Sequence, residues 1–205
     1  MQAELREDSV NPDPFAQLRA WFEQAVATNP GEPFEPNAMT LATIGLDGAP
    51  AARIVLLKEI DGRGLVFFTN CDSSKGRELA RDPRAAVVFY WPWLERQLRV
   101  EGRCERVSRA EAEAYFQTRP RDSQLGALVS RQSTPLPDRS ALQEQMDQAR
   151  AEYEDRPIPM PEDWGGYRLL PMSLEFWQGR PSRLHDRLVY LPAEDGRWGI
   201  TRLAP

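Results

Sequence analysis

The sequence has few of the residues that build metal sites, disulfide frameworks and catalytic triads. Its 205 residues include two cysteines and one histidine. Cys71 and Cys104 are too few for a disulfide framework, and they lack the spacing of paired metal ligands. A single histidine also disfavours a zinc site built from protein side chains. That histidine, His185, lies between Arg183 and Arg187, whose positive charges make it a poor general base for a Ser-His-Asp hydrolase.

Long apolar runs and nucleotide-binding motifs are also missing. No segment approaches the roughly 18 apolar residues that a membrane-spanning helix needs, and residues 1–15 lack the apolar stretch of a signal peptide. There is no Walker loop, no G-x-G-x-x-G after a strand, no G-x-S-x-G and no C-x-x-C. The net charge of −5 disfavours general affinity for nucleic acid or anionic membranes. We therefore expect a cytoplasmic protein whose phosphate sites are built locally from a few cations.

The composition is that of an ordinary globular protein, with 41% hydrophobic and 28% charged residues. Residues 1–12 are polar, and we expect them to be a mobile N-terminal segment. Residues 13–205 are expected to form a single domain. A helix is predicted to begin with Asp13 as its N-cap and Pro14 at its first position.

Strand patterns and hairpin signals dominate the rest of the chain. Strands are predicted at 38–44, 51–58, 65–70, 85–91 and 96–107, with Asp47-Gly48 and Asp61-Gly62 as hairpin turns. Helices are predicted at 73–83, 108–119, 122–130 and 138–155, the second with a capping box. Strand character returns at 167–171, 174–179, 183–191 and 197–203. The expected fold is mainly β with flanking helices, as a barrel or sandwich in which both strand groups complete one barrel.

The segment from Arg183 to Arg187 carries the most informative pattern. In an extended strand Arg183, His185 and Arg187 project from one face, because side chains alternate along a strand. Such a row favours an anionic ligand opposite it. The alternative is a solvated face neutralised by Asp186 and other acidic residues.

A second cluster is predicted around the end of helix 108–119. Tyr115 and Arg119 are four residues apart and share a helical face. Ser123 follows at the start of the next helix, where free backbone N–H groups and the helix dipole favour an anion. These three residues indicate a phosphate site, unless Ser123 or Asp122 is only a helix cap.

Two further groups of cations flank buried strands. Arg53 and Lys58 bracket an apolar strand but fall on opposite faces of it. Both can reach one ligand only through a bulge, strong twist or a ligand at a subunit seam, and otherwise they are surface residues. Ser73, Ser74 and Lys75 open a helix directly after a strand that ends near Thr69. This arrangement suits a phosphate, although a cap alone would also explain it.

Together these segments resemble the pyridoxine 5'-phosphate oxidase family. The resemblance covers nearly the whole chain from Asp13 and rests on eight motifs in order. These are R-I-V-L-L-K (53–58), F-T-N (68–70), L-E-R-Q (94–97), Y-F-x-x-R-P-R-D-S-Q-x-G-A (115–127), S-x-Q-S (130–133), E-F-W-Q-G (175–179), R-L-H-D-R (183–187) and R-L-A-P (202–205). The resemblance implies an FMN-binding split β-barrel, as a homodimer with FMN at the subunit interface.

The resemblance also implies a set of site residues. The FMN contacts would be Arg53, Ile54, Val55, Leu56, Leu57, Lys58, Phe68, Thr69, Ser74, Lys75, Gln97, Gln132, Ser133, Trp177 and Arg187. The substrate contacts would be Lys58, Tyr115, Arg119, Ser123, Arg183 and His185. Arg183 and His185 would be the catalytic pair that clamps the pyridine ring over the flavin. Two departures from the family pattern, Phe68 for tyrosine and Ser74 for arginine, imply weaker FMN binding.

The implied reaction oxidises pyridoxine 5'-phosphate and pyridoxamine 5'-phosphate to pyridoxal 5'-phosphate with dioxygen. Hydrogen peroxide is released, together with ammonia from the amine, and the redox chemistry belongs to the cofactor. One alternative is another split-barrel flavoprotein, such as a flavin or deazaflavin reductase. It should lack the motifs at 115–123 and 183–187. A second alternative is a non-catalytic module that binds pyridoxal phosphate.

Overall fold

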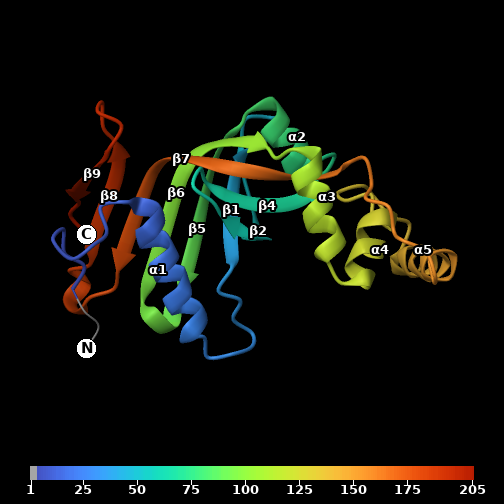
Figure 1. Ribbon diagram of the computed structural model, residues 1–205, viewed down its shortest axis with the longest axis horizontal. Helices are drawn as coiled ribbons and strands as arrows, with labels where there is room; N and C mark the ends of the chain where they lie inside the picture. Colours follow the sequence, from blue (N-terminus) through green and yellow to red (C-terminus); the bar gives the residue numbers. More distant parts are fainter. Residues whose placement is uncertain (1–3) are drawn as a thin grey trace.

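The computed structural model describes residues 4–205, which form one antiparallel sheet with helices around it (Figure 1). The strand order in this part of the chain is β2-β1-β5-β6-β7-β4-β3, and β8 joins β7 to β9. The strands are β1 (Ala38–Ile44), β2 (Pro50–Leu56), β3 (Glu59–Ile60), β4 (Leu65–Asn70), β5 (Arg84–Trp91), β6 (Arg96–Arg106), β7 (Trp164–Gln178), β8 (Asp186–Pro192) and β9 (Trp198–Arg202). The prediction of a mainly β split barrel with flanking helices is confirmed.

Strand β7 organises the sheet because its two halves have different neighbours. Its first half, from Trp164 to Leu169, pairs with β4, and its second half, from Leu174 to Gln178, pairs with β8. Strand β6 pairs with the other edge of β7, and the register of this pairing shifts between Glu101 and Gly102. The sequence predicted two strands, 167–171 and 174–179, where the structure has one. Pro171, which has no N–H to donate, lies inside it at the point where the register with β6 shifts.

The helices are α1 (Pro14–Ala27), α2 (Ser74–Arg81), α3 (Arg109–Thr118), α4 (Arg121–Val129) and α5 (Arg139–Glu152). Helix α1 crosses one face of the sheet, while α3, α4 and α5 gather at the end opposite β8 and β9 (Figure 1). The predicted start of α1 is confirmed, since the Asp13 carboxylate accepts hydrogen bonds from the N–H groups of Phe15 and Ala16. The capping box of α3, between Ser108 and Glu111, is also confirmed.

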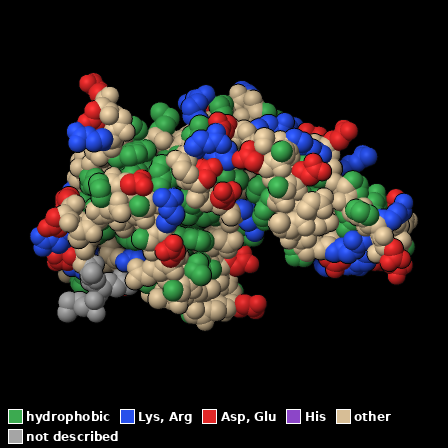
Figure 2. Space-filling model, in the orientation of Figure 1, with side chains coloured by type: hydrophobic (Ala, Val, Ile, Leu, Met, Phe, Trp, Pro, Cys, Tyr) green, Lys and Arg blue, Asp and Glu red, His purple; other side chains and the backbone are tan. Residues whose placement is uncertain are grey.

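Two apolar clusters match this division. The larger lies between α1 and the sheet, where Trp21 packs edge-on against Phe176 with 5.0 Å between ring centroids. The smaller lies under α3, α4 and α5 around Phe116 and Trp164. The smaller cluster therefore fixes the helices of one end independently of the main core. On the surface, acidic and basic side chains are interspersed over the face shown in Figure 2.

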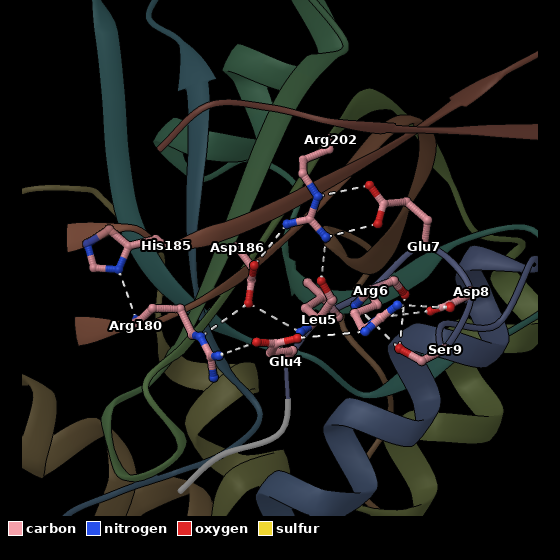
Figure 3. A network of polar contacts seen from close by, with 10 residues as sticks. All are labelled: Glu4, Leu5, Arg6, Glu7, Asp8, Ser9, Arg180, His185, Asp186 and Arg202. Atoms are coloured by element: carbon pink, nitrogen blue, oxygen red, sulfur yellow. Dashed lines mark hydrogen bonds and ion pairs between the residues drawn. The ribbon is translucent and has the colours of Figure 1, made fainter. Parts of the chain in front are cut away.

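The N-terminal residues that the structure describes contact the C-terminal strands (Figure 3). Leu5 is buried and its N–H donates to Asp186 at 3.2 Å. The Glu7 carboxylate accepts two hydrogen bonds from Arg202, at 2.9 and 3.0 Å. Residues 1–3 of the segment expected to be mobile lie outside the described residues. For residues 4–12 mobility stays a prediction, and these contacts disfavour it. The single domain over 13–205 likewise stays a prediction.

The strand predicted over 183–191 is wrong at its first three residues, 183–185. The structure has a short 3-10 helix at Pro181–Arg183, and β8 begins only at Asp186. Ser182 and Arg183 have φ of 58° and 61°, in the left-handed region that non-glycine residues seldom adopt. A strand cannot pass through such backbone, so Arg183, His185 and Arg187 do not form one extended row.

Candidate functional site

A cavity of about 410 Å³ lies between β2, β4, α2, α3 and α4. It brings together most of the predicted cofactor and phosphate contacts. Its lining residues are Ile54, Val55, Leu56, Lys58, Phe68, Thr69, Lys75, Tyr115, Thr118, Arg119, Pro120, Ser123 and Gln132. A larger hollow of about 820 Å³, between α4 and α5, contains none of the predicted residues.

Both lysines of this arginine-rich chain, Lys58 and Lys75, line the cavity. The Lys75 ammonium donates to the side-chain oxygens of Thr69 at 3.2 Å, Ser73 at 3.3 Å and Gln132 at 3.0 Å. All three oxygens are neutral. Burial lowers the pKa of Lys75 below its ordinary value, and the neighbouring Arg53 charge lowers it further. An anion at this position would therefore restore the charge balance around Lys75.

The start of α2 explains how Lys75 comes to lie there. Ser73 is buried and caps the helix, its hydroxyl accepting from the N–H of Gly76, as the sequence allowed. Lys75 then falls in the first turn, next to the end of β4 where Thr69 sits. Ser73 is therefore a cap and at the same time an oxygen that holds the Lys75 ammonium.

At the other side of the cavity lie Tyr115 of α3 and Arg119, which follows the helix as its C-cap, because α3 ends at Thr118 and not at Arg119 as predicted. The Tyr115 ring stacks on Phe68 with 4.1 Å between centroids, and Phe68 stacks on Trp164 at 5.4 Å. The Arg119 guanidinium lies 5.1 Å from the Trp164 ring centroid, a cation–π contact. Its NH1 group is buried and has no hydrogen-bond partner. Burial accordingly lowers the pKa of Arg119 below its ordinary value.

A buried arginine of β7 fixes the N-terminal turn of α3. Arg168, only 3% exposed, contacts three carboxylates: Asp61 at 2.6 Å, Glu111 at 2.7 Å and Glu105 at 3.4 Å. The hydrogen bond from Arg168 lowers the pKa of Glu111 to about 2. Tyr115 lies one helical turn beyond Glu111, so this clamp sets the orientation of the helix that carries the aromatic wall.

Lys58 lines the cavity and Arg53 does not, because the strand predicted over 51–58 ends at Leu56. After Leu56 the chain leaves β1 and pairs with β4 through the Lys58 N–H, which donates to the carbonyl of Val66 at 2.8 Å. Lys58 thereby enters the cavity lining. Arg53 pairs with Glu78 at 2.7 Å and also donates to the Thr43 hydroxyl. It is not a lining residue, although its charge acts on Lys75.

The start of α4 carries no side-chain cap. Its N-cap is Pro120, and Asp122 pairs with Arg150 of α5 at 3.3 Å. Neither Ser123 nor Asp122 is therefore only a cap, and Ser123 lines the cavity. The Ser123 N–H is not free, as the sequence had suggested, because it donates to the carbonyl of Pro120 at 2.8 Å.

The remaining predicted residues form a separate group near β8, which we call the β8 group: Gln97, Trp177, Arg183, His185 and Arg187. Gln97 of β6, Trp177 of β7 and Arg187 of β8 are direct cross-strand neighbours. The His185 ring packs on Trp177 with 4.5 Å between centroids. None of the five lines the cavity, and β8 lies at the opposite end of the molecule from α3 (Figure 1).

Three predicted cofactor contacts also lie outside the lining. Leu57 is buried in the main core and its N–H donates to the carbonyl of Asn37. Ser74 and Ser133 are chain neighbours of the lining residues Lys75 and Gln132. Sequence reasoning missed Thr118 and Pro120 as walls of the cavity. The spacing of Thr118, three residues after Tyr115 and so on the same helical face, could have indicated it.

None of the helices in residues 4–205 is long and apolar enough to cross a lipid bilayer. No set of three His, Cys, Asp or Glu side chains in the same range is arranged to hold a metal ion.

Comparison with known proteins gives the same family for both parts of the chain. Residues 16–153 match the family described as pyridoxamine 5'-phosphate oxidase, and residues 164–205 match the pyridoxine 5'-phosphate oxidase C-terminal dimerisation region. A pyridoxine/pyridoxamine 5'-phosphate oxidase of Cupriavidus pinatubonensis is 53% identical, over 98% of this chain and 93% of that protein. One from a Nostoc species is 52% identical, over 98% and 92%.

Solved structures agree on the fold. PhzG from Burkholderia lata, in complex with tetrahydrophenazine-1-carboxylic acid, superposes with a TM-score of 0.90 at 31% identity, over 98% of both chains. A pyridoxamine 5'-phosphate oxidase-related, FMN-binding protein from Nostoc punctiforme has a TM-score of 0.74 at 19% identity, over 96% of this chain and 99% of that one. The second likeness concerns the fold alone. The match of residues 16–153 and the relatives above 50% identity show that this chain belongs to the pyridoxamine 5'-phosphate oxidase family.

Proposed function

We propose that this protein is an FMN-dependent oxidase that makes pyridoxal 5'-phosphate from pyridoxine 5'-phosphate and pyridoxamine 5'-phosphate. Dioxygen would be the electron acceptor, with release of hydrogen peroxide and, from the amine, of ammonia. The observation that carries the proposal is one cavity with two partly buried cations, Lys75 and Arg119, that no described carboxylate pairs with. Buried charges are costly unless they are paired, and two phosphates would pair them.

The two cations suit two different phosphates. Lys75 lies at the N-terminus of α2 with the Thr69 hydroxyl, and this end fits the phosphate of FMN. Arg119, with Tyr115 and Ser123, fits the phosphate of the substrate. The orphaned NH1 group of Arg119 is what a phosphate oxygen would satisfy.

The strand Ile54–Leu56 and Lys58 would hold FMN between these two ends. FMN, when bound, supplies the acceptor for the hydride that leaves the exocyclic carbon of the substrate. The protein's own part is to bind, orient and exclude water. Holding the substrate by its phosphate is the kind of positioning that lowers the barrier of a reaction step.

The β8 group would complete the site from a second subunit. Arg183 and His185 do not line the cavity of their own chain, and in this proposal another copy supplies them. The C-terminal region that contains them matches a dimerisation region by description, which supports a homodimer. We propose that FMN binds at that interface, with Gln97, Trp177 and Arg187 against it. A cytoplasmic location stays a prediction.

The proposed function is tested by turnover of the purified protein with FMN. Pyridoxine 5'-phosphate or pyridoxamine 5'-phosphate is added in air, and aldehyde and peroxide are measured together. We expect both products in equal amounts from the phosphorylated substrates, and much slower turnover of unphosphorylated pyridoxamine. FMN binding without turnover would favour the non-catalytic module, and turnover only with a nicotinamide donor would favour a reductase. Oxidation of a reduced phenazine carboxylic acid in preference to both phosphates would contradict the proposed substrate.

A further inference from the structure

The turn between β7 and β8 is closed by two contacts at its base (Figure 3). The main-chain N–H of Arg180 donates to Nδ1 of His185 at 3.1 Å. The Arg180 guanidinium Nε lies 3.5 Å from the Asp186 carboxylate. Residues 180 and 186 are thus held together while Arg183 and His185 lie on the loop between them.

The hydrogen bond at Nδ1 determines the tautomer of His185. A neutral imidazole has one nitrogen that donates and one that accepts. Because Nδ1 accepts from Arg180, the ring proton resides on Nε2. The Nε2–H group is therefore the donor that His185 offers to a ligand.

The turn needs external support because its backbone is strained. Ser182 and Arg183 both have positive φ, at 58° and 61°. Such residues persist only where the surrounding structure over-determines them. The contacts of Arg180 with His185 and Asp186 support this turn at its base.

Asp186 is the centre of that support. Its carboxylate, 16% exposed, accepts from the Arg202 guanidinium at 2.8 Å and from the Leu5 N–H at 3.2 Å, besides facing Arg180. Glu7 pairs with Arg202, and this hydrogen bonding lowers the pKa of Glu7 to about 2. Residues 4–7 therefore hold the turn from outside, with Asp186 as the contact between them.

We propose that Asp186 is a positioning residue that, through Arg180, holds His185 as its Nε2–H tautomer and keeps Arg183 in place. This inference rests on the proposed function, because a fixed donor matters only if a substrate ring lies against it. The simpler alternative is that Asp186 only neutralises the arginines beside it. That alternative predicts no change in the state of the imidazole when Asp186 is replaced.

The tautomer is directly measurable because His185 is the only histidine of the chain. In protein labelled with ¹⁵N-histidine, every imidazole signal comes from His185, and the two nitrogen shifts distinguish a protonated from a bare nitrogen. In the substrate-free protein we expect Nε2 protonated and Nδ1 bare. Asp186→Ala should give a mixture of tautomers and a roughly tenfold lower kcat, with FMN affinity unchanged. Asp186→Glu should restore both.

Asp195→Ala is the matched control, since Asp195 follows the same strand but pairs only with Arg197, at 2.6 Å. It should change neither the tautomer nor kcat. If Asp186→Ala does not fold, Glu7→Gln can be used instead, because it weakens the hold on Arg202, the partner of Asp186, and leaves Asp186 in place. We then expect a smaller tautomer change and a smaller loss of kcat. A wild-type Nδ1–H tautomer would overturn the inference. So would an Asp186→Ala variant that loses kcat without a tautomer change, or one that changes tautomer without losing kcat. A wild-type protein without turnover would overturn the proposed function instead, because the imidazole spectrum needs no substrate.

Discussion

Replacing Arg119 with leucine is expected to raise the KM for pyridoxamine 5'-phosphate by about 10- to 100-fold. A hydrogen bond to a charged group contributes about 1.5–3 kcal/mol, and each 1.4 kcal/mol is about tenfold in affinity. Arg119 is the partly buried cation of the substrate end of the cavity, and its NH1 group has no protein partner. FMN affinity should stay unchanged, because the cofactor phosphate is assigned to Lys75.

Folding should tolerate this change, since leucine removes an unsatisfied buried donor and keeps apolar contact with Phe116 and Trp164. Steady-state kinetics, FMN titration and a melting curve measure the three quantities. Arg150→Leu is the matched control, because Arg150 is an exposed cation that pairs with Asp122 of α4 and does not line the cavity. Loss of FMN with an unchanged KM would show that Arg119 holds the cofactor rather than the substrate.

Replacing Lys75 with methionine is expected to weaken FMN binding by about 10- to 100-fold, because it removes a hydrogen bond to a charged group, whose free energy is about that given above for Arg119. The Lys75 ammonium is held only by neutral oxygens, and burial lowers its pKa. A phosphate dianion beside it would favour the charged form and raise that pKa again. Fluorescence titration of the apoprotein with FMN measures the change.

The control for Lys75 lies two residues further along α2. Arg77 is an exposed cation whose guanidinium donates to the carbonyl of Asp72 at 2.6 Å. Arg77→Met removes the same charge from the same helix and should leave the FMN affinity within about twofold, because exposed charges are screened by solvent. Equal losses in both variants would mean that the helix charge as a whole, and not the Lys75 contact, binds the cofactor.

The sequence predicted those elements whose signals are local. The Asp13-Pro14 start of α1 and the Ser108/Glu111 capping box are confirmed, because each is settled within a few residues. Periodicity failed at residues 183–185, since left-handed backbone at Ser182 and Arg183 leaves no trace in an alternating pattern. The end of β2 before Lys58 depends on a hydrogen bond to Val66 of another strand, which spacing along one strand does not show.

The candidate site was predictable only in part for the same reason. The phosphate cluster of Tyr115, Arg119 and Ser123 was predicted from helical spacing and a helix start, and all three line one cavity, although Arg119 follows α3 as its C-cap. The ion pair of Arg53 with Glu78 joins residues far apart in sequence, and no pattern indicated it. The distance of the β8 group from the cavity is a property of the whole sheet, in which β7 places β4 and β8 at its opposite halves.

Subunit complementation tests the central claim, that the cavity of one chain and the β8 group of another form one active site. Chains carrying Arg119→Leu and Arg183→Ala are given different affinity tags, co-expressed, and the mixed dimer is purified through both tags. Each homodimer should be nearly inactive at a low concentration of pyridoxamine 5'-phosphate. In the mixed dimer one of the two shared sites is assembled from unchanged residues only, and the other carries both substitutions. We predict about half the wild-type turnover per dimer from that symmetry. A mixed dimer as inactive as its parents would contradict the claim, because it would place both residues in the site of a single chain.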